Sequence, residues 1–176
     1  TDSTSVITNS TIMHTANNGS SAIYVTGGTM NLADNIISDA YYYAIMVSDA
    51  SPTITGNTIQ DSGYGINVSG SSSTPNITDN TLTGNTYPIY IGSLNSGTTL
   101  TGNTGSDNTY NAIVLASSMT GNFTLNSDND LLYAFSSFTV SSGTTLTIEP
   151  GTVVKFLTTS SYLTVVGTLS AVGTAT

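Results

Sequence analysis

Hydrophobic and polar residues follow a phrase that recurs along the chain: an apolar residue, Thr, Gly or Asp, Asn, Thr and a second apolar residue. Variants of this phrase occupy residues 7–12, 32–37, 54–59, 77–82, 100–105 and 119–124. Their first residues are 25, 22, 23, 23 and 19 positions apart. A near-constant step of this length is typical of a solenoid, in which each repeat buries its apolar side only by stacking on its neighbours.

A second phrase recurs in step with the first, at residues 22–25, 44–47, 65–68, 88–91 and 112–115. Both phrases are short, rich in β-branched residues and alternating in polarity, and Gly, Asn, Asp and Ser separate them, which is the pattern of strands and turns. No segment has a helical period. About 22 residues per repeat leave room for two or three short strands. The pattern therefore predicts an all-β fold, a parallel β-helix of about eight coils.

The phrase also predicts a column of polar side chains inside the corner. Alternation turns Ile54 inward and Thr55 outward, Gly56 allows a sharp bend, and Asn57 turns inward before Ile59 returns to the core. Stacked coils would superimpose these amides, and each could hydrogen-bond to the next. The expected ladder contains Ser10, Asn35, Asn57, Asn80, Asn103 and Asn122.

The corner Gly56-Asn57-Thr58-Ile59, followed by Tyr64-Gly65-Ile66-Asn67-Val68, resembles the repeats of right-handed parallel β-helices of the pectate-lyase-like superfamily. The resemblance covers roughly residues 5–135 and implies a right-handed coil. Residues 143–156 and 163–171 resemble the opening coils of large secreted β-helix proteins. This fold hosts lyases, hydrolases, epimerases, adhesins and structural surface proteins, so the resemblance implies no single function.

Three regions are expected along the chain. Residues 1–124 form regular coils, and residues 125–142 form an irregular coil or junction. Residues 143–176 form further coils that resemble the start of a second stack.

The amino-acid composition argues against two classes of partner, nucleic acids and membranes. The 176 residues are 38% hydrophobic and 6% charged, with a net charge of −9, Lys155 as the only basic residue besides His14, and no Arg. Nucleic acid binding depends on Lys and Arg, so a nucleic acid partner is not expected. No apolar run reaches membrane length, so membrane insertion is not expected either. The sequence has no cysteine, so the redox compartment is not indicated directly. The Ser-, Thr-, Asn- and Gly-rich, Lys-poor composition indicates an extracellular or cell-surface protein.

Candidate chemistry is sparse. In the superfamily that the chain resembles, uronate lyases use Arg or Lys with calcium, and pectin hydrolases use clustered Asp with His and an Arg-x-Lys pair. Neither set occurs in this sequence. Asp39 and Asp61 are expected in one column on adjacent coils, where turn formation explains them better than glycoside hydrolysis. Asp128 and Asp130 are a weak candidate calcium site. No catalytic residue and no cofactor other than this calcium is expected.

Outward side chains suggest contact surfaces. Thr8, Thr55, Thr78, Thr101 and Thr120 are expected to align, interrupted by Ala33, as an exposed threonine column. Such a column is ordinary for strands and is also what an ice-binding solenoid presents. A second outward column is expected to hold Tyr24, Met46, Tyr90 and Val114, and could contact sugar rings or a protein. Tyr43, Tyr64 and Tyr87 are expected to stack from coil to coil.

Five Asn-x-Ser/Thr sequons permit glycosylation outside the cell, at Asn9, Asn18, Asn67, Asn76 and Asn122. Neither end of the chain shows a capping element, so the open coils are expected to pair with other copies or to continue in a longer protein. The sequence thus predicts a non-catalytic extracellular structural protein, a self-assembling building block of a surface layer, sheath or filament. A carbohydrate-binding or carbohydrate-processing β-helix and an ice-binding solenoid are the alternatives.

Overall fold

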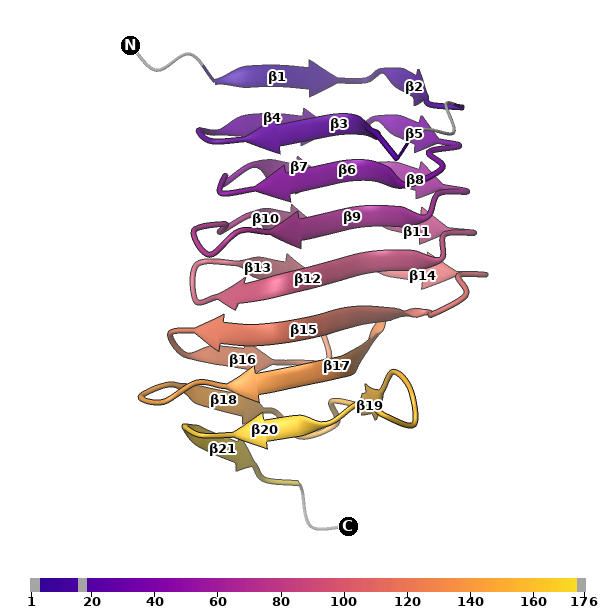
Figure 1. Ribbon diagram of the computed structural model, residues 1–176. Helices are drawn as coiled ribbons and strands as arrows, with labels where there is room; N and C mark the ends of the chain where they lie inside the picture. Colours follow the sequence, from indigo (N-terminus) through magenta and orange to yellow (C-terminus); the bar gives the residue numbers. More distant parts are fainter. Residues whose placement is uncertain (1–3, 16–18, 174–176) are drawn as a thin grey trace.

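The chain is a stack of short parallel strands (Figure 1). The computed structural model describes residues 4–15 and 19–173, and these residues contain strands but no helix. They form about seven coils of roughly 23 residues. The predicted all-β parallel solenoid is confirmed. The coil count is slightly below the expected eight because two short strands, β19 and β20, both pair with the single strand β17.

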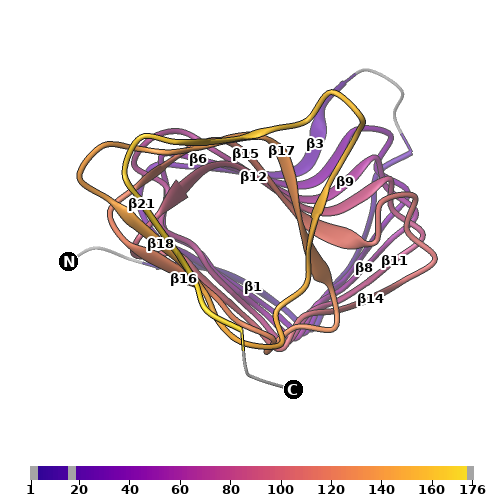
Figure 2. The same cartoon turned by 90° about the horizontal axis from the view of Figure 1, so that it is seen from below.

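Each regular coil has three sides, seen end-on in Figure 2. The first phrase supplies two of them, with one strand on each side of the asparagine corner. Sheet A contains β1 (Ser5–Thr8), β4 (Met30–Ala33), β7 (Thr53–Thr55), β10 (Asn76–Thr78) and β13 (Thr99–Thr101). Sheet B contains β2 (Thr11–Met13), β5 (Ile36–Ser38), β8 (Thr58–Gln60), β11 (Thr81–Thr83) and β14 (Thr104–Ser106).

The second phrase supplies the third side, sheet C, which runs through all the coils. It contains β3 (Ser21–Thr26), β6 (Tyr43–Ser48), β9 (Tyr64–Ser69), β12 (Tyr87–Asn95), β15 (Ala112–Thr120), β17 (Leu132–Val140), β19 (Val154–Phe156) and β20 (Leu163–Val165). Strands β12, β15 and β17 are the longest in this sheet, with nine residues each, whereas β3, β6 and β9 have six and β19 and β20 have three.

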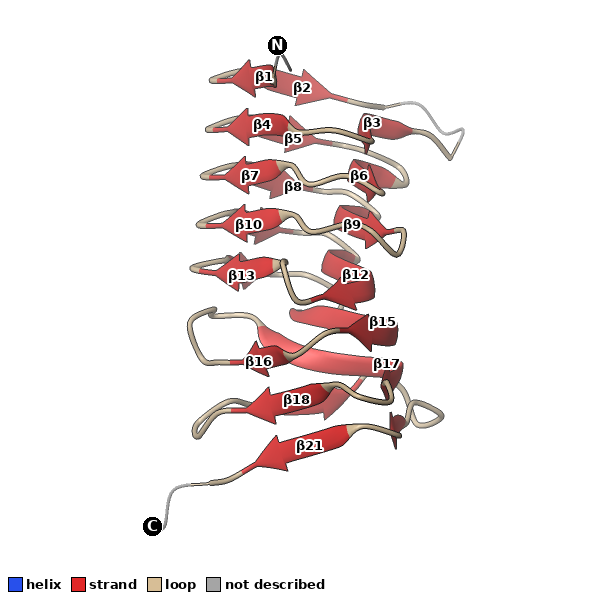
Figure 3. Ribbon diagram, turned by 90° about the vertical axis from the view of Figure 1, so that its left-hand side faces the viewer, coloured by secondary structure: helices blue, strands red, loops and turns tan. Residues whose placement is uncertain are grey.

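A fourth sheet, sheet D, follows sheet A along the same side of the solenoid (Figures 2 and 3). It contains β16 (Phe123–Leu125), β18 (Thr145–Ile148) and β21 (Thr168–Ala171). Strands β13 and β16 do not pair, so this side of the solenoid is interrupted whereas sheet C is continuous.

The core is a narrow column of aliphatic side chains. The parallel register places Leu32, Ile54, Ile77 and Leu100 one above the other, and all four are buried. Because each contributes about 1.5 to 3 kcal/mol when fully buried, the column stabilises the stack in proportion to the number of coils. In the last coils, by contrast, β19, β20 and β21 contain no buried residue.

The corner before each ladder asparagine requires a left-handed backbone conformation. Asp34, Gly56, Asp79 and Gly102 occupy this position in successive coils, with φ between 56° and 68°. Asp and Gly are residues that adopt this conformation at low cost. They alternate here because the Asp side chain of one coil covers the Gly of the next: a Cβ on Gly56 would lie 2.5 Å from Asp34 Oδ1.

Candidate functional site

The most distinctive surface of the molecule is a cluster of aromatic rings that we call the tyrosine face. It lies along sheet C and the corner that leads into it. Its members are Tyr24, Tyr41, Tyr42, Tyr43, Tyr64, Tyr87, Tyr90 and Tyr110. The cluster arises because the strand register repeats Tyr at the start of three neighbouring strands, β6, β9 and β12.

The centre of the tyrosine face is a stack that runs along the solenoid axis. Ring centroids are 5.1 Å apart between Tyr43 and Tyr64 and 4.7 Å apart between Tyr64 and Tyr87. The predicted stack of these three residues is confirmed. It continues to Tyr110, which is 4.8 Å from Tyr87 and was not predicted because it lies in a turn before β15. Each such pair adds about 0.5 to 1.5 kcal/mol beyond area burial.

Two further rings brace this stack from the side. Tyr90 lies edge-on to Tyr64 and Tyr87, with interplanar angles of 87° and 79°. Tyr42 lies 6.2 Å from Tyr64 in a nearly parallel orientation. The rings therefore form a fixed array, and its outer members present aromatic surface to solvent.

Exposure is concentrated in three rings. Tyr24 and Tyr41 are each 59% exposed, and Tyr42 is 42% exposed. The surface between the rings is hollowed in two places. A hollow of about 460 Å³ is lined by Tyr24, Tyr43 and Met46 together with residues 19–21, and one of about 100 Å³ is lined by Tyr41, Tyr42, Tyr64 and Tyr87 together with Gly63 and Thr86.

The crowding of phenols shifts their ionisation. Burial, and then the neighbouring tyrosines Tyr87, Tyr90, Tyr43 and Tyr42, raise the pKa of Tyr64 to about 12. Burial likewise raises the pKa of Tyr43 and Tyr87. The raised pKa values keep the phenols of Tyr43, Tyr64 and Tyr87 protonated well above neutral pH, so the centre of the array presents hydroxyl groups and ring faces.

The outward column of sheet C differs from the prediction in two places. Strand pairing gives the order Tyr24, Met46, Asn67, Tyr90, Val114, so Asn67 stands between Met46 and Tyr90. Val114 is not exposed, because it packs with Ala112 and Ala134 beneath Tyr90 and Leu157. Long side chains above the sheet, which alternation alone does not reveal, cover this end of the column.

Behind the tyrosine face, the asparagine ladder joins sheets A and B. The main-chain N–H groups of Ser10, Asn35, Asn57 and Asn80 each donate to the Oδ1 atom of the next asparagine along the stack, at 3.0 to 3.2 Å. The Nδ2 groups of Asn35, Asn57 and Asn80 donate to the same oxygens, at 2.9 to 3.0 Å. The predicted ladder is thus present from Ser10 to Asn103.

The far end of the ladder was predicted wrongly. Asn103 donates to Asn129 Oδ1, not to Asn122. Asn122 is exposed, and its Oδ1 accepts from the Thr145 N–H at 2.8 Å. The physical reason is that Met119 and Thr120 belong to sheet C, where they pair with Leu94 and Asn95. The sixth phrase is therefore displaced from the column of the other five.

A second ladder, which the sequence analysis missed, lies at the corner after sheet B. The Ala40 N–H donates to Ser62 Oγ, the Ser62 N–H donates to Asn85 Oδ1, and Asn85 donates to Asn108 Oδ1 from both its main-chain N–H and its Nδ2. A signal was present in the sequence, since Ser62, Asn85 and Asn108 are 23 residues apart. Side-chain ladders thus bind successive coils at two of the three corners.

Comparison with known proteins agrees with this geometry. The family described as a right-handed β-helix region matches residues 1–153. The chain belongs to the right-handed β-helix family. No curated protein matches the chain, and no solved structure matches it. Because right-handed β-helices serve many unrelated activities, the function of this β-helix has to be argued from its own surfaces.

The threonine column of this β-helix lies on sheet A, opposite the tyrosine face. Pairing aligns Thr8, Ala33, Thr55, Thr78 and Thr101, and the Thr78 hydroxyl donates to Thr55 Oγ1 at 3.1 Å. Thr120 was wrongly placed in this column, because it pairs with Asn95 in sheet C. Ice binding by the threonine column stays a prediction.

The sequons differ in accessibility. Asn9, Asn76 and Asn122 are exposed, whereas Asn67 is only 7% exposed beneath the tyrosine face. Asn18 lies outside the described residues. Glycosylation stays a prediction, and the described surface favours Asn9, Asn76 and Asn122 over Asn67.

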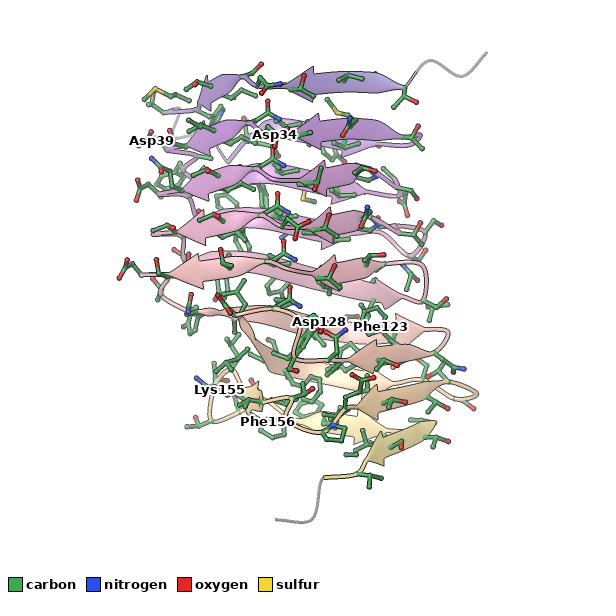
Figure 4. All side chains as sticks on the ribbon, turned by 180° about the vertical axis from the view of Figure 1, so that it is seen from behind. Asp34, Asp39, Phe123, Asp128, Lys155 and Phe156 are labelled. Atoms are coloured by element: carbon green, nitrogen blue, oxygen red, sulfur yellow. The ribbon has the colours of Figure 1, made fainter. Side chains whose placement is uncertain are left out.

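The remaining polar candidates lie at corners. Asp39 and Asp61 share a column, as expected, and both have a left-handed backbone, with φ of 59° and 52° (Figure 4 labels Asp39). Asp128 Oδ2 accepts from Asn126 Nδ2 at 2.7 Å, and the Asp130 N–H donates to the Asn103 carbonyl.

Across residues 4–15 and 19–173, no group of three or more His, Cys, Asp or Glu side chains could hold a metal ion. That same part of the chain has no helix with the length and hydropathy of a membrane span.

Proposed function

We propose that this β-helix is a non-catalytic extracellular structural protein, a building block of a cell-surface layer, sheath or filament. In this proposal its copies pack side by side through the tyrosine face. The observation that supports it best is the set of three rings, Tyr24, Tyr41 and Tyr42, that remain 42 to 59% exposed beside a rigid aromatic stack.

Tyrosine suits such a contact for a physical reason. It supplies a large amphipathic surface, yet it has only two side-chain torsions to immobilise, so binding costs little conformational entropy. Tyr is accordingly enriched at protein interfaces, where charged side chains are depleted from the centre. Neither hollow of the tyrosine face is lined by Asp, Glu, Lys, Arg or His, so filling these hollows with a side chain of another copy does not bury any of those charged groups.

The ladders supply the mechanical part of the function. Two columns of side-chain hydrogen bonds and the tyrosine stack all run along the solenoid axis, and each joins consecutive coils. Bending the stack or opening one coil would break several of these contacts together. Such a rod resists local unfolding and therefore proteolysis.

Sedimentation velocity over a range of protein concentrations tests the proposal. The double variant Tyr41→Ser/Tyr42→Ser removes two exposed rings, and we expect it to need at least roughly tenfold more protein than the native chain to associate. Tyr162→Ser is the matched control, because Tyr162 is 57% exposed but lies on the last coils, away from the tyrosine face. A native chain that stays monomeric, or a double variant that associates like the native chain, would overturn the proposal.

A second function, binding of a neutral carbohydrate, is favoured by the two hollows between the rings. Aromatic faces bordered by hydroxyl groups, as in the larger hollow, fit the alternating C–H and O–H surface of a sugar ring. The chain has ten Tyr and no Trp, and eight of the ten belong to the tyrosine face, so most of the tyrosine fluorescence comes from this face. A saturable change with neutral glucan oligosaccharides that is lost in Tyr41→Ser/Tyr42→Ser, in a chain that remains monomeric, would select this function over self-assembly.

A further inference from the structure

Sheets A and D lie on the same side of the solenoid but are not joined. Strand β13 is the last strand of sheet A, and β16 is an end strand of sheet D. In Figure 3 the separation between β13 and β16 is visibly wider than that between any other neighbouring strands on this side. Sheet C, in contrast, passes this level without a break, through paired β12, β15 and β17. At this level, therefore, sheet C is continuous, sheet B ends at β14, and the side formed by sheets A and D is interrupted between β13 and β16.

Main-chain groups on both strands face this interruption. In a parallel ladder the N–H and C=O of one residue point to the same neighbouring strand, and those of the next residue point to the other. Thr99 donates to the Pro75 carbonyl and Thr101 accepts from Asp79, so the N–H and C=O of Leu100 point away from β10. By the same alternation Leu125, whose carbonyl accepts from Glu149, faces β18, so the N–H and C=O of Thr124 point toward β13.

A hollow of about 330 Å³ lies between the two strands. Its lining combines hydroxyl and amide side chains with Leu100 and Phe123, and includes no charged residue. The described segment 126–130 closes one end, where the Gly102 N–H donates to the Asp128 carbonyl at 2.9 Å and Asn129 Nδ2 donates to the Leu100 carbonyl at 2.9 Å. Figure 4 shows Phe123 and Asp128 at this level of the stack.

We propose that this slot binds an extended segment of a partner protein, which inserts as an added strand between β13 and β16. Strand addition to an open sheet edge is an established mode of peptide recognition, because main-chain hydrogen bonds supply affinity and alternate side chains supply specificity. Here the inserted strand gains hydrogen bonds from two edges and joins sheets A and D into one ladder, as sheet C already is. This proposal is independent of the tyrosine face.

The slot also specifies the sequence of its partner. An inserted residue beside Leu100 faces the core column, so it must be apolar, and its two neighbours face outward beside Thr99 and Thr101. The required pattern is polar, apolar, polar, without charge. The chain itself contains such a segment in residues 143–148, Gly-Thr-Thr-Leu-Thr-Ile, whose strand β18 pairs with the other edge of β16. A peptide of this sequence is therefore a suitable probe.

The experiment is a titration of the isotope-labelled full chain with this peptide, followed by amide NMR spectra. We expect saturable shifts at Leu100, Thr101 and Thr124, and none with a peptide of the same composition in which Leu and Thr no longer alternate. Thr124→Pro removes the N–H that faces the slot but no hydrogen bond to β18, so we expect at least roughly tenfold weaker binding in a folded protein.

Thr159→Pro is the matched control, because the Ser161 N–H donates to the Thr158 carbonyl and Thr159 is thus the second residue of a turn that accepts proline. It should bind the peptide like the native chain. The proposal is overturned if no saturable shift occurs, if the shifts map to β1, β21 or the tyrosine face, or if Thr124→Pro, folded by its amide spectrum, binds as well as Thr159→Pro.

Discussion

Asn80 and Asn122 occupy the same place in the repeated phrase, but only Asn80 lies in a buried ladder. Asn80 is fully buried and joins Asn57 to Asn103, whereas Asn122 is exposed and its Oδ1 accepts from the Thr145 N–H, outside the ladder. The same contrast holds for the coils around them. The coils from β4 to β14 combine an aliphatic column, two ladders and the tyrosine stack, whereas in the last coils β19, β20 and β21 have no buried residue. The position of the coil in the stack, more than the local phrase, therefore decides whether an asparagine is buried in a ladder or exposed at the surface.

The largest expected effect comes from breaking the ladder at its centre. Asn80→Ala removes an oxygen that accepts from the N–H and Nδ2 of Asn57, and a donor to Ile54 and Asn103, so buried polar groups lose their partners. We expect a loss of about 3 to 5 kcal/mol in the free energy of unfolding, measured by urea denaturation. Asn122→Ala is the control and should cost less than about 1 kcal/mol. Similar losses for the two variants would contradict the comparison.

The next effect concerns the core column. Ile77→Ala leaves a cavity in a fully buried position and should cost about 2 to 4 kcal/mol. Ile148 is an isoleucine of strand β18 in sheet D and is only half-buried. Ile148→Ala should therefore lower the free energy of unfolding by about 1 to 2 kcal/mol. Urea denaturation again measures both. If Ile148→Ala proves the more costly of the two, then the last coils are packed as tightly as the regular stack.

A smaller effect is expected at the left-handed corners. Gly56 and Gly143 both have positive φ, of 65° and 76°. A Cβ at Gly56 would meet Asp34 Oδ1 at 2.5 Å, whereas a Cβ at Gly143 would have no neighbour within 4 Å. Gly143→Ala should therefore lower the free energy of unfolding only by the backbone strain of about 1 kcal/mol, and Gly56→Ala should lower it by about 1 kcal/mol more. Thermal denaturation of the two variants measures the difference. Equal melting temperatures would show that the Asp34 side chain moves aside freely.

The smallest effect is the response of the tyrosine stack to alkaline pH. The folded chain raises the pKa of Tyr64 from 10.0 to about 12, so it holds the phenol proton more tightly than the unfolded chain does. This contribution to stability is complete below pH 10 and is lost as the pH rises toward 12. Denaturation midpoints should fall over this interval, and less so in Tyr64→Phe. A midpoint that does not change with pH would contradict the packing of the stack.

The sequence predicted the regular part of the molecule well because one local rule repeats there. An apolar residue, a left-handed corner and an inward polar residue, Ser10 in the first phrase and Asn in the next four, recur every 22 to 25 residues, so their alignment follows from the period alone. The tyrosine stack from Tyr43 to Tyr87 followed from the same period. The second ladder was equally periodic, but its Ser62 member obscured the pattern.

The rest depended on tertiary structure that the period does not encode. The nine-residue strand β15 extends through Thr120 after a register shift at Ala116 and Ser117, which removes Met119 from the first column. Asn129 enters the ladder from residues 126–131, a segment that is not among the six phrases because Asn126 stands where the phrase has its first apolar residue. Val114 is covered by residues of other coils. In each case a contact between distant residues overrides a local pattern.

The most direct test of the proposed function is hydroxyl-radical footprinting of the native chain at low and high protein concentration, with modified side chains quantified by mass spectrometry. The account predicts that Tyr24, Tyr41 and Tyr42 become protected as the concentration rises, while Tyr162, equally exposed on the last coils, remains reactive. Modification of Tyr41 and Tyr42 that does not change with concentration, or protection of Tyr162 in their place, would contradict it.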